Sequence, residues 1–372
     1  IEEAKTVLQA GEKQIEPNRG EYAKFLCNKG HVQHLEGNDD SARSSLTRAR
    51  VLAEELKVHD ESEVAQAIQE LETVLGFDAP DVSDEMRALA LIEAERLLEL
   101  GSIERAQNNL EPALDCFQKA VEIFRKHGDR TGEGCARGCV GNVLQVQGKW
   151  EQSSDYLSDA IEIFNQIGDQ NREGIYLGNL GVVMVARGQM ERAVECYSRA
   201  IDIARSLGDA TNEGVFLGNL GDVYRTLGQY EPAATFFRQA IEIARQVGNK
   251  CSEGLHLGNL GDVLLGLEQS ETAEAAFRTA ISICDEAFPV AAGAFRGSLA
   301  LLLTRKGAHE EVETLLQVGE RLVVSVPAEH AKFLSKKGHI QQLLGDTDDA
   351  QASLKAAQVL ASGLNVDHRS DV

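Results

Sequence analysis

The chain of 372 residues is acidic, because 59 Asp and Glu residues outnumber 37 Lys and Arg residues and give a formal net charge of -22. Nucleic acid and anionic membranes repel such a surface, so neither is expected as the main partner. The longest apolar run, residues 287–295, is far shorter than the roughly 20 residues that span a bilayer.

Residues 1–57 are predicted to form a half-repeat and one full helical repeat. Segment 2–15 matches the second helix of a repeat whose first helix is absent, and a full pair of helices follows over residues 21–56. Residues 2–64 return as residues 310–372 at a constant offset of 308. The chain therefore begins and ends in the same phase of a larger pattern, which indicates a fragment of a longer protein or an array with similar ends.

The pattern breaks over residues 58–85, where an irregular acidic helix and a linker are predicted. Residues Glu63–Leu75 fit one helix. Gly76–Ser83 is typical of a linker, with Ser83 as the N-cap of the helix that follows. This stretch is the predicted internal boundary or hinge.

From residue 86 to residue 372 the sequence predicts a continuous array of about six repeats. Each unit is a glycine-bearing helix, a turn, an amphipathic helix whose apolar residues recur with a period of 3.6, and a second turn. Equivalent glycines recur every 40 residues, at Gly101, Gly141, Gly181, Gly221 and Gly261. The amphipathic helices end at Gly128, Gly168, Gly208 and Gly248, where glycine supplies the left-handed conformation that follows a helix. Beyond these units the spacing loosens, and Phe288-Pro289 replaces the glycine turn.

The first helix of each unit has a face with almost no side chains. Gly174, Gly178 and Gly181 are spaced i, i+4 and i+7 on one side of a helix. The same motif returns at 214–221 and 254–261, with a weaker copy at 134–141. Each glycine costs the helix about 1 kcal/mol relative to alanine, so a close contact must compensate. Helix packing is favoured for Gly181 and its equivalents, whereas for Gly178 and its equivalents a helix and a bound ligand both remain open.

This pattern of small and large residues resembles the tetratricopeptide repeat. It runs through Leu177, Leu180, Gly181, Ala193, Tyr197 and Ala200, and again through Leu217, Leu220, Gly221, Tyr224, Ala233, Phe237 and Ala240. Units of this length, with Gly-Asp-x-x-x-Glu-Gly between helices and Asn-Leu-Gly in the first helix, resemble Pins-type spindle-orientation scaffolds and, more loosely, kinesin light chains. The resemblance implies an all-α, right-handed superhelical solenoid of antiparallel helix pairs whose first helices line a concave groove.

An asparagine series within the first helices is the candidate binding site. Asn179, Asn219 and Asn259 recur every 40 residues at the position that faces the groove in the resembled families. An asparagine side chain donates and accepts hydrogen bonds, so it can bind a peptide group of an extended chain. The predicted peptide-binding residues are Asn142, Asn179, Asn219, Asn259, Asp222, Arg225 and Asp262. The alternative is that the asparagines cap or bridge neighbouring helices.

No enzyme signature is found in the sequence. Gly132–Gly138 approaches the dinucleotide fingerprint but has no strand before it, and P-loop, zincin and G-x-S-x-G motifs are absent. The seven cysteines are scattered without a Cys-x-x-Cys pair, which indicates buried thiols in a reduced, cytoplasmic protein. No His and Cys set has the spacing of a zinc site. We therefore expect no catalysis, no cofactor and no bound metal.

These observations predict a non-enzymatic scaffold that binds an extended peptide of a protein partner in the concave groove. Asp222 and Asp262 would repel a C-terminal carboxylate, so a basic or neutral internal peptide is favoured. Two alternatives remain open. The chain is a regulatory or sensor segment of a larger signalling enzyme, or it is an array that self-assembles into homo-oligomers through its terminal half-repeat.

Overall fold

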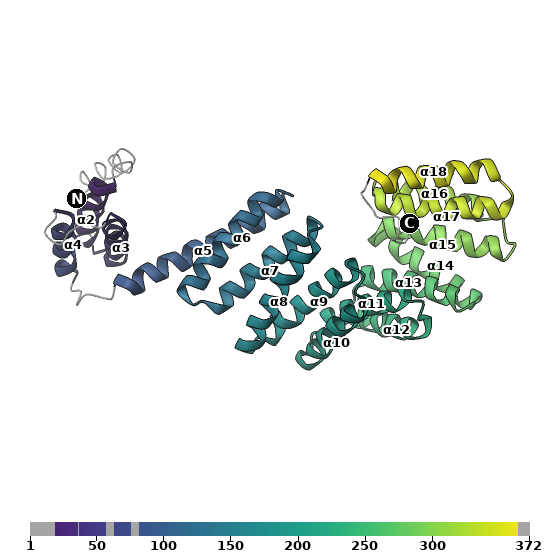
Figure 1. Cartoon of the computed structure of the whole chain (residues 1–372), viewed down its shortest axis with the longest axis horizontal. Coiled ribbons are helices and arrows are strands. Elements are labelled where there is room, and N and C mark those ends of the chain that lie inside the picture. Colours follow the sequence, from purple (N-terminus) through teal and green to yellow (C-terminus); the bar gives the residue numbers. More distant parts are fainter. Residues whose placement is uncertain (1–18, 36, 57–62, 76–81, 364–372) are drawn as a thin grey trace. The chain divides into compact units, whose positions relative to one another are not determined.

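The computed structural model describes residues 19–35, 37–56, 63–75 and 82–363, which form α-helices joined by short turns (Figure 1). No strand occurs within these ranges, and the all-α prediction is confirmed. The chain divides into two compact units, residues 1–136 and 137–372. The predicted half-repeat at 2–15 lies outside the described residues.

The described part of the first unit contains two helix pairs, a single helix and the start of a further helix. Its helices are α2 (Arg19–Leu35), α3 (Asp39–Glu55), α4 (Glu63–Val74), α5 (Val82–Ala106) and α6 (Leu110–His127). Helices α2 and α3 pack as a pair, as do α5 and α6, and α4 contacts both α2 and α3. Leu26, Leu46 and Leu71, one from each of the first three helices, are fully buried together. Helix α4 thus supplies the apolar side chains that close this small core.

Two elements of the predicted interruption can be placed in the structure. Helix α4 occupies the stretch where a single acidic helix was expected. Helix α5 begins at Val82, so Ser83 lies inside the first turn instead of capping it. Residues 57–62 and 76–81, which include most of the predicted linker, are outside the described part of the chain.

The second unit is a stack of antiparallel helix pairs. Helix α7 (Arg130–Val146) crosses the division between the units. The helices after it are α8 (Trp150–Ile167), α9 (Gln170–Ala186), α10 (Met190–Leu207), α11 (Ala210–Thr226), α12 (Tyr230–Gln246), α13 (Lys250–Gly266), α14 (Ser270–Ala287), α15 (Pro289–Arg305), α16 (Val312–Val323), α17 (Pro327–Leu344) and α18 (Thr347–Gly363). From α9 onward, each odd-numbered helix packs against the even-numbered helix that follows it.

The turns between pairs are built as the sequence predicts. Gly208 ends α10 in the left-handed region with φ 68°. The side chain of Asp209 then accepts a hydrogen bond from the Asn212 backbone N–H at 3.0 Å and caps α11. Gly168 and Asp169 form the same turn before α9. The glycine and the acidic cap together end one helix and begin the next within two residues.

Large side chains fill the glycine faces of the first helices. Gly181, Gly221 and Gly261 contact rings from the second helix of their own pair, which are Tyr197, Phe237 and Phe277. Gly138, Gly178, Gly218 and Gly258 contact rings from the first helix of the next pair, which are Tyr176, Phe216, His256 and Phe295. A Cβ atom at any of the second set would overlap the facing ring. Helix packing therefore explains both sets of glycines, including the set for which a ligand was an open alternative.

Candidate functional site

The asparagine series occupies one equivalent position on three successive first helices. Asn179 lies on α9, Asn219 on α11 and Asn259 on α13, and each is half-buried. The residue before each asparagine is a glycine covered by the ring of the next first helix. The asparagines are therefore held on well-packed helices, with their side chains still accessible.

The three asparagines differ in their hydrogen bonds. Asn179 Nδ2 donates to Asn142 Oδ1 of α7 at 3.0 Å, which links two neighbouring first helices. Asn219 and Asn259 have no side-chain hydrogen-bond partner among the described residues. The first two members of the predicted set therefore bridge helices, as the alternative interpretation expects. The later two keep their donors and acceptors unoccupied.

A pocket of about 430 Å³ lies further along the array and collects four of the predicted residues. These four are Asp222, Arg225, Asn259 and Asp262. The other lining residues are Leu255, Phe288, Val290, Ala291, Ala294, Phe295, Glu329, Lys332, Phe333, Ser335 and Lys336. The pocket is thus formed by α11, α13, α15 and α17, four successive first helices of the second unit. Asn142, Asn179 and Asn219 are not part of its lining.

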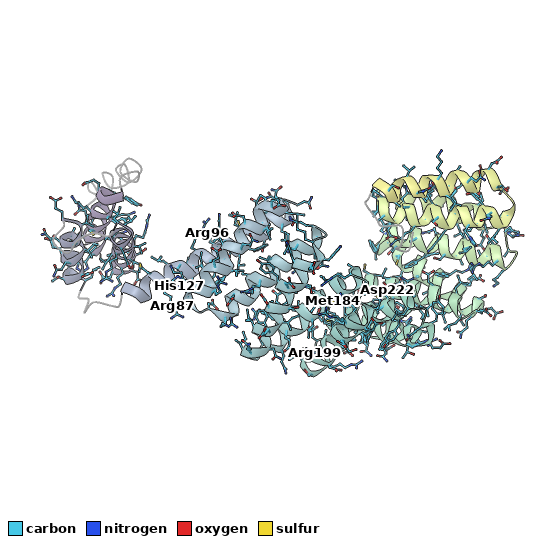
Figure 2. All side chains as sticks on the ribbon, viewed as in Figure 1. Arg87, Arg96, His127, Met184, Arg199 and Asp222 are labelled. Carbon is cyan, nitrogen blue, oxygen red and sulfur yellow. The ribbon has the colours of Figure 1, made fainter. Side chains whose placement is uncertain are left out.

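Opposite charges enter the pocket from different helices. Asp222 on α11 accepts a hydrogen bond from Arg225 Nε at 2.8 Å, so this carboxylate is neutralised within its own helix (Figure 2 labels Asp222). Asp262 on α13 has no ion-pair or hydrogen-bond partner among the residues that the structure describes. A half-buried carboxylate without a partner favours a cationic group of a ligand.

Helix α17 supplies two lysines to the pocket, which Arg225 of α11 also lines. Lys332 Nζ forms an ion pair with Glu329 at 3.2 Å within the same helix. Lys336 Nζ donates to Ser298 Oγ of α15 at 2.7 Å, and Ser298 is buried. Apolar side chains from the start of α15 and Phe333 also line the pocket. The pocket therefore offers one carboxylate without a partner, two ammonium groups, the Asp222–Arg225 ion pair and an apolar surface.

The contribution of α15 and α17 was missed by the sequence prediction. The asparagine series ends at Asn259, and the spacing changes afterwards, so no motif extended the site past α13. Two signals were present. One is Phe288-Pro289, which starts α15 with a proline at its first position and places Phe288 in the pocket wall. The other is the run of lysines on α17, in a chain that is otherwise acidic.

Helix α13 also carries a buried histidine, His256, which is not part of the pocket lining. His256 occupies on α13 the position that holds Phe216 on α11 and Phe295 on α15, and its ring fills the space above Gly218. It is 8% exposed, and its Nδ1 has no hydrogen-bond partner among the described residues. Burial lowers the pKa of His256 from its ordinary value near 6.5 to about 4, because the imidazolium would lose its hydration. His256 is therefore a neutral packing residue at neutral pH.

The described residues contain neither a metal-binding cluster nor a helix that could span a bilayer. Within the described ranges, no group of three or more His, Cys, Asp or Glu side chains is placed to hold a metal ion. No helix in that part of the chain is both long and apolar enough to cross a membrane. The pocket brings together hydrogen-bonding, charged and apolar side chains.

Family comparisons agree with the repeat architecture. Profiles described as tetratricopeptide repeat match residues 94–127 and the overlapping segments 132–206, 174–246 and 212–286, which together cover about half of the chain. The chain belongs to the tetratricopeptide repeat family. Its helix pairs form the solenoid that is typical of these proteins. No curated protein matches the chain.

Solved structures share this tetratricopeptide repeat fold at low identity. Aspartyl phosphate phosphatase F from Bacillus subtilis is 16% identical with a TM-score of 0.64, over 93% of this chain and 95% of that one. The Rap conjugation gene regulator of plasmid pLS20, in complex with the Phr* peptide, is 17% identical with a TM-score of 0.51, over 92% and 96%. A signal transduction ATPase with a tetratricopeptide repeat sensor from Pyrococcus horikoshii is 18% identical with a TM-score of 0.56, over 92% and 52%. Likeness at these identities concerns the fold alone.

Proposed function

We propose that this tetratricopeptide repeat protein is a non-enzymatic interaction module that binds an extended peptide segment of a partner protein along its first helices. The observation that carries the proposal is the pocket formed by α11, α13, α15 and α17, in which Asn259 and Asp262 present unpaired polar groups beside an apolar surface. Such a site is concave and mostly apolar with a few placed polar groups, as ligand sites in proteins usually are.

Each part of the pocket has a separate role in this proposal. Asn259 donates to and accepts from one peptide group of the ligand, which gives affinity without selecting a sequence. Asp262 selects a lysine or arginine side chain, because its carboxylate has no cation of its own among the described residues. Phe288 and Phe295 receive an apolar side chain next to that cation. The preferred ligand is an internal peptide with a basic residue beside an apolar one.

The lysines of α17 refine this preference. Lys336 is held by Ser298, and Lys332 by Glu329, so both ammonium groups are oriented before a ligand arrives. A ligand carboxylate on the far side of the apolar residue would be attracted to them. The peptide therefore carries its positive charge toward α13 and any negative charge toward α17. This order of charges sets the direction in which the peptide lies.

The Rap regulator supports a peptide ligand, since that solenoid was solved in complex with the Phr* peptide. The Pyrococcus ATPase favours a second candidate function, because there a tetratricopeptide repeat array serves as the sensor of a larger signalling enzyme. Both candidates place a ligand on the array. They differ in whether binding changes the activity of a domain outside residues 1–372.

The test is selection of ligands from a library of random 12-residue peptides displayed on phage, followed by calorimetric titration of the selected peptides. We expect enrichment of a basic residue next to an apolar one. The double variant Asn259→Ala with Asp262→Ala should bind the selected peptides at least tenfold more weakly. A loss of one charge-assisted hydrogen bond and one neutral hydrogen bond is enough for a change of this size.

The matched control is the double variant Asn171→Ala with Asp155→Ala, which removes the same two chemical groups from exposed positions outside the pocket. This control should bind like the wild type. Equal binding by the pocket variant and the control would contradict the proposed site. A library that yields no enriched peptide at all would contradict the proposed function.

A further inference from the structure

The chain contains two structural copies of one helix pair. Sequence positions 2–64 and 310–372 match at an offset of 308, and the described parts of the two copies, α2–α3 and α17–α18, fold alike. Ser45 Oγ donates to Gln33 Oε1 at 2.7 Å, and the equivalent Ser353 Oγ donates to Gln341 Oε1 at the same distance. These copies belong to different compact units, so each can be compared in its own surroundings.

Ion pairs and turns repeat between the copies as well. Lys24 contacts Glu21 at 3.3 Å, and the equivalent Lys332 contacts Glu329 at 3.2 Å. Both turns between the paired helices use a glycine of positive φ, which is 74° at Gly37 and 91° at Gly345. The two pairs therefore share a hydrogen bond, an ion pair and a turn. What differs is the surface that each presents to a following helix.

In the first copy that surface is covered by α4. The side chain of Leu71 in α4 lies above Gly30, where its Cδ2 would be 2.5 Å from an added Cβ atom. Leu46 of α3 is only 1% exposed beneath it. Val64, Ile68 and Leu75 continue the apolar stripe of α4. The helix thus buries one face against the pair, as the first helix of a next repeat does.

In the second copy the same face is exposed. Leu354, the equivalent of Leu46, is 42% exposed. Gly338, the equivalent of Gly30, has the Leu354 side chain above it, 2.7 Å from an added Cβ atom. Leu354 therefore occupies the space that Leu71 of α4 takes in the first copy.

Charges indicate what kind of helix fits this face. Helix α4 has the sequence EVAQAIQELETV, with three glutamates and no basic residue. Its first residue, Glu63, accepts a hydrogen bond from Lys24, and Glu72 forms an ion pair with the buried Arg50 at 2.6 Å. On α17, Lys336 donates to Ser298 of α15 and Lys337 forms an ion pair with Glu320 of α16, so Lys332, the equivalent of Lys24, is the lysine left for a following helix. The equivalent of Arg50 is Gln358, so the charge complementarity to a helix like α4 lies at the first turn of that helix.

We propose that the face of α17 and α18 around Gly338 and Leu354 is a docking surface for an acidic amphipathic helix built like α4. The docked helix places a leucine above Gly338, which requires Leu354 to turn into the position that Leu46 already has. A carboxylate in its first turn pairs with Lys332, as Glu63 pairs with Lys24. This surface shares Lys332 with the pocket but does not include Asn259 or Asp262, so the proposal does not rest on the peptide-binding function.

The probe is a fluorescent peptide of residues 63–75, titrated into the full chain and followed by anisotropy. We expect saturable binding that becomes at least tenfold weaker when the peptide carries Leu71→Asp. The chain variant Leu354→Glu should lose binding to the same extent, and it alters only a partly exposed side chain. Leu207→Glu changes an equally exposed leucine, 47% accessible on α10, and should bind like the wild type. Asn259→Ala with Asp262→Ala should also bind the probe normally.

A free peptide of this length is barely helical in water, so the entropy lost when it folds weakens its binding. A second measurement avoids this cost by attaching the helix to the chain. Sequence positions 371 and 372 match Glu63 and Val64, so appending residues 65–76 directly after Val372 continues the copy in register. We expect this extended chain to show slower amide exchange in α17 and α18 than an extension with the Leu71→Asp change. Exchange rates that are equal in the two extensions, together with no saturable binding of the free peptide, would overturn the proposal. Binding that survives Leu354→Glu would overturn the assigned face.

Discussion

Helices α9–α14 and helices α15–α18 differ in what packs against the glycines of their first helices. In the regular pairs, a glycine of the first helix faces an aromatic ring of the second, as Gly261 faces Phe277. In the pair α15–α16, glycines stand on both helices, and a Cβ atom on Gly293 would be 2.8 Å from the carbonyl oxygen of Gly319. A ring can shift by rotating its side chain, whereas a backbone carbonyl cannot. The regular region is therefore tolerant and periodic, and the later region is closer packed and specific.

The largest expected effect comes from breaking the backbone contact of α15–α16. Gly293→Val should destabilise the second unit by about 3 kcal/mol or more, because overpacking against an immobile backbone forces the helices apart. Gly261→Ala should cost only about 1 kcal/mol, since the Phe277 ring can move and alanine recovers about 1 kcal/mol of helix propensity. The measurement is urea unfolding followed by circular dichroism.

Gly363→Ala is the control for this pair of substitutions, because nothing lies within 4 Å of a Cβ atom there. It should leave the urea midpoint unchanged or raise it slightly. The comparison of regions fails if Gly261→Ala proves as costly as Gly293→Val.

An effect of similar size is expected from His256, which stands where equivalent helices carry a phenylalanine. Its pKa is lowered to about 4 in the folded chain, so between pH 6.5 and 4 the unfolded chain binds a proton that the folded chain does not. The contribution of His256 to the free energy of unfolding is therefore fully present above pH 6.5. It falls with decreasing pH, by about 3 kcal/mol at pH 4. His256→Phe should remove this part of the pH dependence. The quantity to compare is the difference in unfolding free energy between wild type and variant at pH 7 and at pH 4.5, where identical slopes would refute the assignment.

The smallest expected effect divides the asparagine series. Asn179→Ala should cost about 1 kcal/mol, because it breaks the hydrogen bond to Asn142. Asn259→Ala should change stability by less than about 0.5 kcal/mol, as partly exposed substitutions without a lost contact usually do. Thermal unfolding of the two variants side by side gives the answer. Equal losses would mean that Asn259 has a structural partner after all.

The regular region was predictable because one physical motif is repeated. Glycine every 40 residues, a left-handed glycine after α8, α10 and α12, and an Asp or Asn cap identify the helices, and the structure has them in those places. The partners of Gly178 and Gly218 were not predictable. They are rings from the next repeat, and the sequence spacing alone does not tell a ring from a ligand as the group that fills a bare helix face.

The candidate site was predictable only in part, for the same reason. Asn259, Asp262 and Asp222 stand out as members of a series, and they line one pocket. Lys332 and Lys336 belong to a helix that had lost the series, so only their position in space connects them with the aspartates. For Asn179 the motif misleads in the other direction. It belongs to the series, but its side-chain amide donates a hydrogen bond to Asn142.

The contact in which each first helix receives a ring from the next has a mechanical consequence. Every pair is held mainly by its immediate neighbours, so such an array opens from an end, one pair at a time. A molecule that touches α11 and α17 together adds a link that spans three steps of this chain of contacts. When the pocket is occupied, the bound molecule joins α11 to α17, so the helix pairs between them open together or not at all. Amide exchange in α17 would slow on binding as much as exchange in α11.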